Sequence, residues 1–136
     1  MAEAGYSGTP LIKKLGIKPE MKVLVIHHGE DYFDLLGFNI SNQFITKNEI
    51  PDLIHLFAKN VTAFKKEMKA VLKFSKQNPA VIVWVSWYKK SSGIGTDLSE
   101  NIIRNFALQN NLVDVKVCAV SEAWSGLKLV VPLAKR

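Results

Sequence analysis

The feature that most constrains the fold is the run AVIVWVSW (80–87), in which apolar side chains occupy nearly every position. A strand that is apolar on both faces suits the centre of a parallel sheet, where helices cover both sides. KVLVIH (22–27) and DLIHLFA (52–58) have the same character and a similar length. The sequence therefore predicts a sheet built around buried central strands.

Short or amphipathic segments separate these apolar runs. Helical spacing and stop signals predict helices at 10–16, 30–37, 61–76 and 97–110. Gly16 and Gly37 are the expected stops of the first two. FNISNQFIT (38–46) is more polar and is expected to be a strand nearer the sheet edge. Strands that alternate with helices imply right-handed crossovers and a mostly parallel sheet covered on both faces.

The last two apolar runs, 113–120 and 127–131, are separated only by the brief SEAWSG. This gap is too short for a crossover helix, so these two strands are expected to pair antiparallel. We expect residues 1–136 to form a single three-layer α/β domain with about six strands. The ends of the chain, 1–8 and 133–136, are the expected flexible parts.

Composition limits the class of protein. Cys118 is the one cysteine, which rules out an internal disulfide framework and suits a reducing compartment. The first ten residues have no basic and apolar leader pattern, and no apolar run approaches the ~20 residues that cross a bilayer. The expectation is a cytoplasmic protein with no membrane contact.

The net charge of +6 comes mostly from lysine, because Arg104 and Arg136 are the two arginines among 18 basic residues. Many of the lysines fall in VTAFKKEMKAVLKFSK (61–76), opposite an apolar face. No aromatic residue interleaves the lysines on that face, as single-stranded nucleic-acid binding would favour. We interpret the lysines as the solvated face of an amphipathic helix and do not expect a nucleic-acid partner.

Two resemblances follow from longer motifs. LGIKPEMKVLVI (15–26) and the order of elements resemble class I methyltransferases. Over nearly its full length the chain resembles the bacterial domain-of-unknown-function family 3052, in GYSGTPLIKKLGIKP (5–19), WYKKSSGIGTDL (87–98) and VDVKVCAVSEAWSGLKLV (113–130). These resemblances imply a Rossmann-like domain with strand order 2-1-3-4-6-5, strand 6 being antiparallel. The family supplies no activity, cofactor or catalytic residue.

The methyltransferase resemblance weakens at the site itself. Those enzymes carry a glycine-rich loop after strand 1, where this chain has HHGEDY (27–32) with Gly29 alone. They also usually place an acidic residue at the end of strand 2, where this chain offers none before Glu49. No G-x-G-x-x-G follows any strand, so a dinucleotide site is equally unsupported and the cofactor stays unassigned.

In open parallel sheets ligands bind beyond the carboxyl ends of the strands, near the point where strand order reverses. The segments expected there are 27–31, 58–62, 88–96 and the turn 121–126. The loop before the helix at 97 has the composition of an anion site, since helix N-termini and ammonium groups suit phosphate or carboxylate. The expected ligand-binding residues are Lys89, Lys90, Ser91, Ser92, Gly93, Gly95, Thr96, Trp124 and Ser125.

A purely structural interpretation of the same loop stays open. Thr96 or Asp97 can cap the helix, with Asp97 and Glu100 forming a variant capping box. Gly93 and Gly95 can simply supply positive backbone φ angles. Trp124 can pack over the end of the sheet rather than line a ligand site.

Histidines supply the catalytic candidates. Adjacent strand residues point to opposite faces, so His27 and His28 are not expected to chelate one metal, and no metal site is predicted. His28 with Glu30 or Asp31 could provide a base and an orienting carboxylate. His55, inside an apolar strand, is expected to be a buried, hydrogen-bonded imidazole, and Cys118 an inert core thiol.

Three functional hypotheses remain. The leading one is a small binding domain for an anionic molecule, phosphorylated or carboxylated, at the carboxyl edge of the sheet. The second is an enzyme related to S-adenosylmethionine-dependent methyltransferases, with His28 as base. The third is a protein-interaction module in which Trp87, Tyr88 or Trp124 forms a partner patch. An oligomer is left open, as is the question whether the chain is an enzyme.

Overall fold

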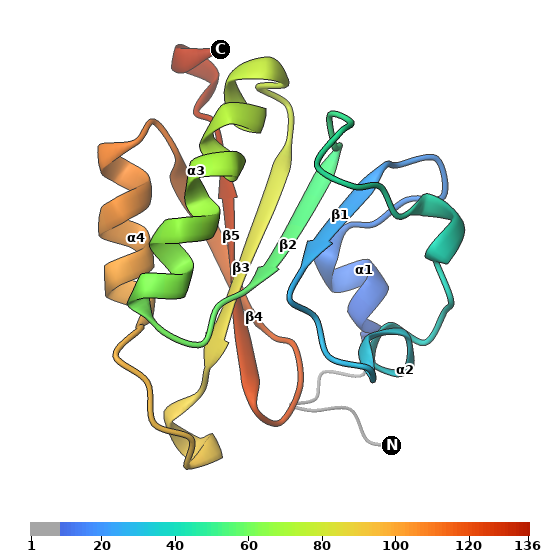
Figure 1. Cartoon of the computed structure of the whole chain (residues 1–136), viewed down its shortest axis with the longest axis vertical. Helices are drawn as coiled ribbons and strands as arrows, with labels where there is room; N and C mark the ends of the chain where they lie inside the picture. The colour runs from blue at the N-terminus through green and yellow to red at the C-terminus, as the bar shows by residue number, and fades with distance from the viewer. Residues whose placement is uncertain (1–8) are drawn as a thin grey trace.

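The computed structural model describes residues 9–136, so the expected flexibility of residues 1–8 lies outside the described part of the chain. One sheet of five strands runs through the domain (Figure 1). Its strands, in spatial order, are β1 (Val23–Ile26), β2 (Leu53–Phe57), β3 (Ile82–Tyr88), β5 (Trp124–Val130) and β4 (Val113–Ala119).

The sheet is mixed. β1, β2 and β3 are parallel, whereas β5 pairs antiparallel with both β3 and β4. The expected antiparallel pair at the end of the chain is therefore confirmed. The expectation of six strands in a mostly parallel sheet is wrong, and with it the order 2-1-3-4-6-5.

The segment 38–46, which was expected to be a strand, does not form one. It forms the 3-10 helix η1 (Ser41–Gln43), and its backbone pairs with the sheet through one parallel bridge between Phe44 and Val23. The reason is local, because the Asn39 side chain accepts a hydrogen bond from the Ser41 N–H at 2.9 Å. Such a side-chain bond competes with the ladder that a strand would need.

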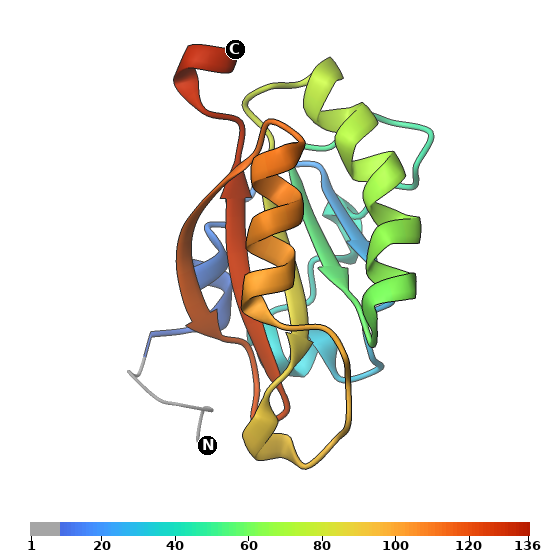
Figure 2. The same cartoon turned by 90° about the vertical axis from the view of Figure 1, so that its left-hand side faces the viewer.

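Helices cover both faces of the sheet, as the two perpendicular views show (Figure 1, Figure 2). On one face lie α3 (Val61–Gln77) and α4 (Glu100–Gln109), and on the other α1 (Leu11–Leu15) and α2 (Tyr32–Leu36). The three-layer α/β architecture is therefore as expected.

Each face of the sheet has its own apolar core. The α3/α4 side buries alternate strand residues such as Leu56 and Val85 against Phe64 and Met68. The α1/α2 side packs Trp84 against α1, and the Trp84 indole N–H donates to the Leu15 carbonyl at 2.8 Å. Side chains of a strand alternate between faces, so strands that are apolar at every position feed both cores.

The helix ends follow their local sequences. Gly16 and Gly37 close α1 and α2 at φ angles of 79° and 86°, the left-handed conformation expected of them. After β5, residues Leu133–Lys135 form the 3-10 helix η3, and the Arg136 Nε donates to the Val131 carbonyl. Flexibility of 133–136 stays a prediction. Among the described residues, no helix combines the length and the apolarity that a membrane span requires.

Candidate ligand site at the carboxyl edge of the sheet

The connections after β1 and β2 leave toward opposite faces. The chain passes from β1 to α2, which packs in the α1/α2 core, and from β2 to α3, which packs in the other core. The loops 27–31 and 58–60 therefore part between two neighbouring parallel strands. In Figure 1 these strand ends lie at the lower edge of the sheet, where the β4–β5 turn also lies. This is the switch point at which open α/β sheets bind ligands.

The loop after β3 is closed by its own hydrogen bonds. Residues Lys90–Ser92 form the 3-10 helix η2, which ends at Gly93 with a φ angle of 77°. The Ser92 hydroxyl donates to the Lys89 carbonyl at 2.6 Å and accepts from the Ile94 N–H at 3.1 Å. Gly95 is not among the positive-φ residues, so the expectation of positive φ is right for Gly93 and wrong for Gly95.

The end of the same loop caps a different helix from the one expected. The Asp97 carboxylate accepts a hydrogen bond from the Val61 N–H at 2.9 Å, at the start of α3. The Thr96 hydroxyl donates to the Lys59 carbonyl at 2.7 Å. Asp97 thereby occupies the place that an external anion would take at the N-terminus of α3.

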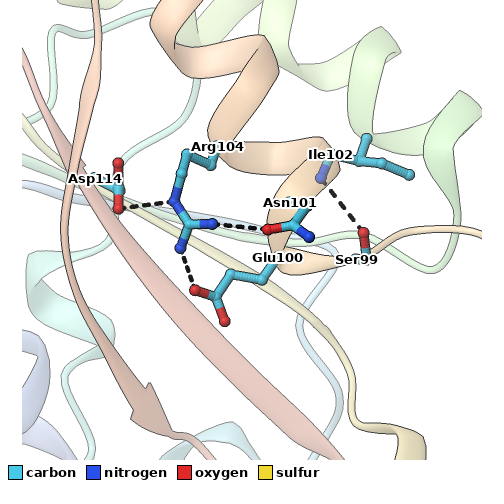
Figure 3. A network of polar contacts seen from close by, with 6 residues as sticks. All are labelled: Ser99, Glu100, Asn101, Ile102, Arg104 and Asp114. Atoms are coloured by element: carbon cyan, nitrogen blue, oxygen red, sulfur yellow. Dashed lines mark hydrogen bonds and ion pairs between the residues drawn. The ribbon is translucent and has the colours of Figure 1, made fainter.

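Helix α4 begins at Glu100 and is capped by Ser99, whose hydroxyl accepts from the Ile102 N–H at 3.4 Å (Figure 3). The expected N-cap at Thr96 or Asp97 and the expected Asp97–Glu100 capping box are therefore wrong. Glu100 instead pairs with Arg104. Both helix N-termini beside the loop are thus supplied with acceptors by the chain itself.

Ammonium groups remain on the carboxyl edge. Lys59 and Lys90 are exposed and Lys89 is half-buried. Among residues 9–136 no ion pair joins any of these three lysines to a carboxylate. The backbone N–H of Lys89 donates to the Ala123 carbonyl at 2.8 Å, and the Thr96 hydroxyl donates to the backbone carbonyl of Lys59. Hydrogen bonds therefore connect the β2 exit, the β3 exit and the β4–β5 turn.

Trp124 packs over the end of the sheet. Its ring stacks on Tyr88 at a centroid distance of 4.2 Å and meets Phe57 edge-on at 5.0 Å. Ser125 lies opposite Trp87 in the β3–β5 ladder. Trp87 itself is 8% exposed and belongs to the α3/α4 core, so it contributes nothing to a partner patch.

The structure does not bring the expected catalytic pair together. His28 and Glu30 are both exposed, but the His28 Nδ1 lies 2.7 Å from the Gly29 carbonyl oxygen and no hydrogen bond joins it to Glu30 or Asp31. The His28 ring instead lies 5.3 Å from that of Tyr32, on the α1/α2 side. His27 points to the α3 side, so the two neighbours do face opposite ways, as expected.

His27 belongs to a cluster that sequence reasoning missed. Its Nε2 lies 2.8 Å from one carboxylate oxygen of Glu67 on α3, while Lys47 Nζ lies 2.9 Å from the other. The hydrogen bond from Lys47, and then that from His27, lower the pKa of Glu67, against the opposing effect of its burial. One sequence signal could have located this cluster, because Glu67 stands on the apolar face of its helix, beside Met68 and between Phe64 and Val71.

His55 forms a separate, fully buried chain of polar groups. Its Nδ1 lies 2.8 Å from the Tyr32 hydroxyl, and its Nε2 lies 2.8 Å from the Ser86 hydroxyl. Burial, and secondarily the charge of His28, lower the pKa of His55 to about 3. Burial likewise raises the pKa of the Tyr32 phenol. The expected buried, hydrogen-bonded imidazole is confirmed.

The thiol of Cys118 is not activated, and the described residues form no metal-binding cluster. Cys118 is half-buried, and burial raises the pKa of its thiol, which disfavours the reactive thiolate. Within residues 9–136, no group of three or more His, Cys, Asp or Glu side chains is arranged to hold a metal ion.

Comparison with solved structures finds the same architecture in proteins of very different sequence. A protein of the NADB-Rossmann superfamily from Streptococcus agalactiae gives a TM-score of 0.51 at 7% identity, over 90% of this chain and 68% of that chain. An uncharacterised protein from Listeria monocytogenes serotype 4b gives 0.58 at 9% identity, over 92% and 68%. A protein described as a "putative type 11 methyltransferase" from Sulfolobus solfataricus gives 0.52 at 18% identity, over 85% and 87%.

No family model and no curated protein matches the chain. The resemblance to domain-of-unknown-function family 3052 therefore stays a prediction. At identities this low, the likeness to solved structures concerns the fold and not the activity. The chain is an α/β domain with Rossmann-like and methyltransferase-like structural neighbours.

Proposed function

We propose that this chain is a small α/β domain that binds an anionic small molecule at the carboxyl edge of its sheet. The observation that carries the proposal is the switch between β1 and β2, where the loops 27–31 and 58–60 part toward opposite faces. On one side of that point lies Lys59, connected through Thr96 to the loop that bears Lys89 and Lys90.

The distribution of charge suggests how such a ligand lies. The β2 and β3 exits carry the lysines without a carboxylate partner, so they suit the phosphate or carboxylate group. The β1 exit carries exposed Glu30 and Asp31, which repel an anion but accept hydrogen bonds from hydroxyl groups. The ligand class that fits both sides is a hydroxylated small molecule with one anionic end.

A titration at low ionic strength tests the proposal, because salt screens exposed lysines. Isothermal calorimetry with inorganic phosphate, pyrophosphate, ribose 5-phosphate and citrate is expected to show binding of at least one of them. Lys59→Gln and the double variant Lys89→Gln, Lys90→Gln are each expected to weaken it by about tenfold.

Lys73→Gln is the matched control, since Lys73 is an exposed lysine on α3 that takes part in no ion pair among the described residues. Its affinity should equal that of the unaltered chain. Equal weakening by all three changes would indicate unspecific attraction to a basic protein. Absence of binding by all four anions would overturn the proposal.

The resemblance to domain-of-unknown-function family 3052 forms part of the proposal. Its quoted segments correspond to α1, to the loop after β3, and to the β4–β5 pair. Two of them, 87–98 and 113–130, meet where the Lys89 N–H binds the Ala123 carbonyl on the proposed ligand edge.

A second candidate is an enzyme related to S-adenosylmethionine-dependent methyltransferases. The observation in its favour is the likeness to the protein from Sulfolobus solfataricus, which extends over 87% of that chain. Against it stand the β1 exit, with Gly29 alone, and the segment 38–46, which pairs with the sheet through one bridge at Phe44 instead of forming a strand. Equilibrium dialysis with S-adenosylmethionine separates the two candidates, because binding is required of the enzyme and not of the anion-binding domain.

A further inference from the structure

The backbone of His27 is unusual. Its φ angle is +62°, in the left-handed region that histidine adopts seldom, and it directly follows the last residue of β1. Such a backbone conformation is strained, and strained residues of this kind concentrate at functional sites.

The partner of His27 is built into the helix layer. The Glu67 side chain is only 9% exposed, and each of its two carboxylate oxygens is engaged, one by Lys47 and one by His27. These hydrogen bonds lower the pKa of Glu67, so the group stays ionised and can only accept. Nε2 of His27 must then carry the proton of their shared hydrogen bond.

Fixing Nε2–H leaves Nδ1 of the neutral ring with a lone pair. Within residues 9–136, Nδ1 of His27 has no hydrogen-bond partner, in contrast to both ring nitrogens of His55. The arrangement has the parts of an activated base: an accessible imidazole nitrogen and a carboxylate that orients the ring from its other side.

We propose that His27 is the proton-accepting residue of the switch-point site, and that Glu67 is its positioning residue. The inference rests on the proposed function. An O–H group of a bound hydroxylated anion donates a hydrogen bond to Nδ1, which draws the proton away from the ligand oxygen and makes that oxygen more nucleophilic. The ring keeps its Nε2–H on Glu67, whose negative charge stabilises the positive charge that develops on the imidazole. Lys47 and the neighbouring His28 are the other titratable groups beside this pair, and Lys47 lowers the pKa of Glu67.

Reactivity toward diethyl pyrocarbonate measures the nitrogen directly, because the reagent acylates unprotonated imidazole. Peptide mass mapping across pH 5–8 should show His27 reacting and His55 protected by burial. Glu67→Gln preserves the shape of the side chain but removes its charge. At the alkaline end of that range it should slow the reaction at His27 by about threefold or more, because the carboxylate no longer orients the ring and draws on its Nε2–H.

His28→Asn is the matched control, because it changes the neighbouring imidazole and leaves the His27–Glu67 pair in place. It should leave the rate of the reaction at His27 unchanged within about twofold. Failure of His27 to react would overturn the proposal, because a base of this kind needs an accessible Nδ1. An identical rate in Glu67→Gln would also overturn it.

A second experiment tests whether His27 lies in the ligand site. Ribose 5-phosphate, which has hydroxyls and an anionic end, should protect His27 from the reagent, and Lys59→Gln should raise the concentration needed for that protection by about tenfold. Ribose 5-phosphate that binds by calorimetry without protecting His27 would overturn its place in the site. If none of the four anions binds, the proposed function fails instead, and the ligand-free reactivity still decides whether Glu67 activates His27.

Discussion

The two histidines at 27 and 55 are held by hydrogen bonds of the same length, yet they occupy opposite kinds of environment. His55 is fully buried, and both of its ring nitrogens lie 2.8 Å from hydroxyl oxygens. His27 is exposed, has one bound nitrogen and sits on a strained backbone. The difference is that both ring nitrogens of His55 are satisfied inside the core, whereas among the described residues Nδ1 of His27 has no hydrogen-bond partner.

Replacing the buried histidine should have the largest effect on stability. His55→Leu roughly preserves volume but leaves the hydroxyls of Tyr32 and Ser86 buried without their partner. Each unsatisfied hydroxyl costs about 1–3 kcal/mol, so the free energy of unfolding should fall by about 3 kcal/mol. Urea denaturation at pH 7 measures it. A loss below 1 kcal/mol would mean that the Tyr32–His55–Ser86 chain contributes little.

The same buried imidazole should make the protein sensitive to acid. The pKa of His55 is about 3 in the folded chain against 6.5 for an ordinary histidine, so below pH 6.5 the unfolded state binds a proton that the folded state excludes. The contribution of His55 to the free energy of unfolding is thus complete above pH 6.5 and is lost as the pH falls toward 3. Between pH 7 and 4.5 this amounts to about 2–3 kcal/mol.

Urea midpoints measured over that pH range check the prediction, with His55→Leu as the comparison, because a chain without this imidazole should lose most of the slope. Glu67 adds a second loss of stability only below pH 4.5, the ordinary pKa of a glutamate, because its own pKa is lowered in the fold. A slope that is the same in both chains above pH 4.5 would assign the acid sensitivity to other groups.

Substitutions of the exposed His27 should change the free energy of unfolding mainly through the backbone conformation of this residue. Glycine adopts a positive φ angle without strain and alanine does not, so His27→Ala should be about 1 kcal/mol less stable than His27→Gly. Both variants lose the bond to Glu67 equally, which makes each the control of the other. Thermal unfolding measures the difference. Equal stability would indicate that residue 27 relaxes to a negative φ angle once the imidazole is gone.

The sequence predicted the sheet better than the site. Strands such as 80–87 were readable because burial on both faces demands apolar residues throughout. The segment 38–46 was misread because the side chain of Asn39 satisfies the backbone locally, which a polarity pattern does not reveal.

The contacts that organise the site join residues far apart in the chain. The Asp97 carboxylate accepts a hydrogen bond from the N–H of Val61, and the Glu67 carboxylate forms hydrogen bonds with His27 and Lys47. Spacing within one segment carries no information about such partners. A charged residue on the buried face of a helix, as Glu67 is, is the one local signal that a remote partner must exist.

The smallest effect is expected far from both histidines, at Arg104 on α4. Its guanidinium donates to Asp114 on β4, to Asn101 and to Glu100, and fastens the edge strand to the helix layer (Figure 3). These partners, Asp114 foremost, raise the pKa of the guanidinium, so Arg104 keeps its charge at every pH considered above. Because it is open to solvent, water replaces most of what Arg104→Met removes, and Tm should fall by about 2 °C or less. Calorimetry of this variant sharpens the contrast with His55, because every side-chain nitrogen of both residues has a hydrogen-bond partner, while His55 is buried and Arg104 is partly exposed. A loss comparable to that of His55→Leu would show that connectivity, rather than burial, determines how much a satisfied polar group contributes.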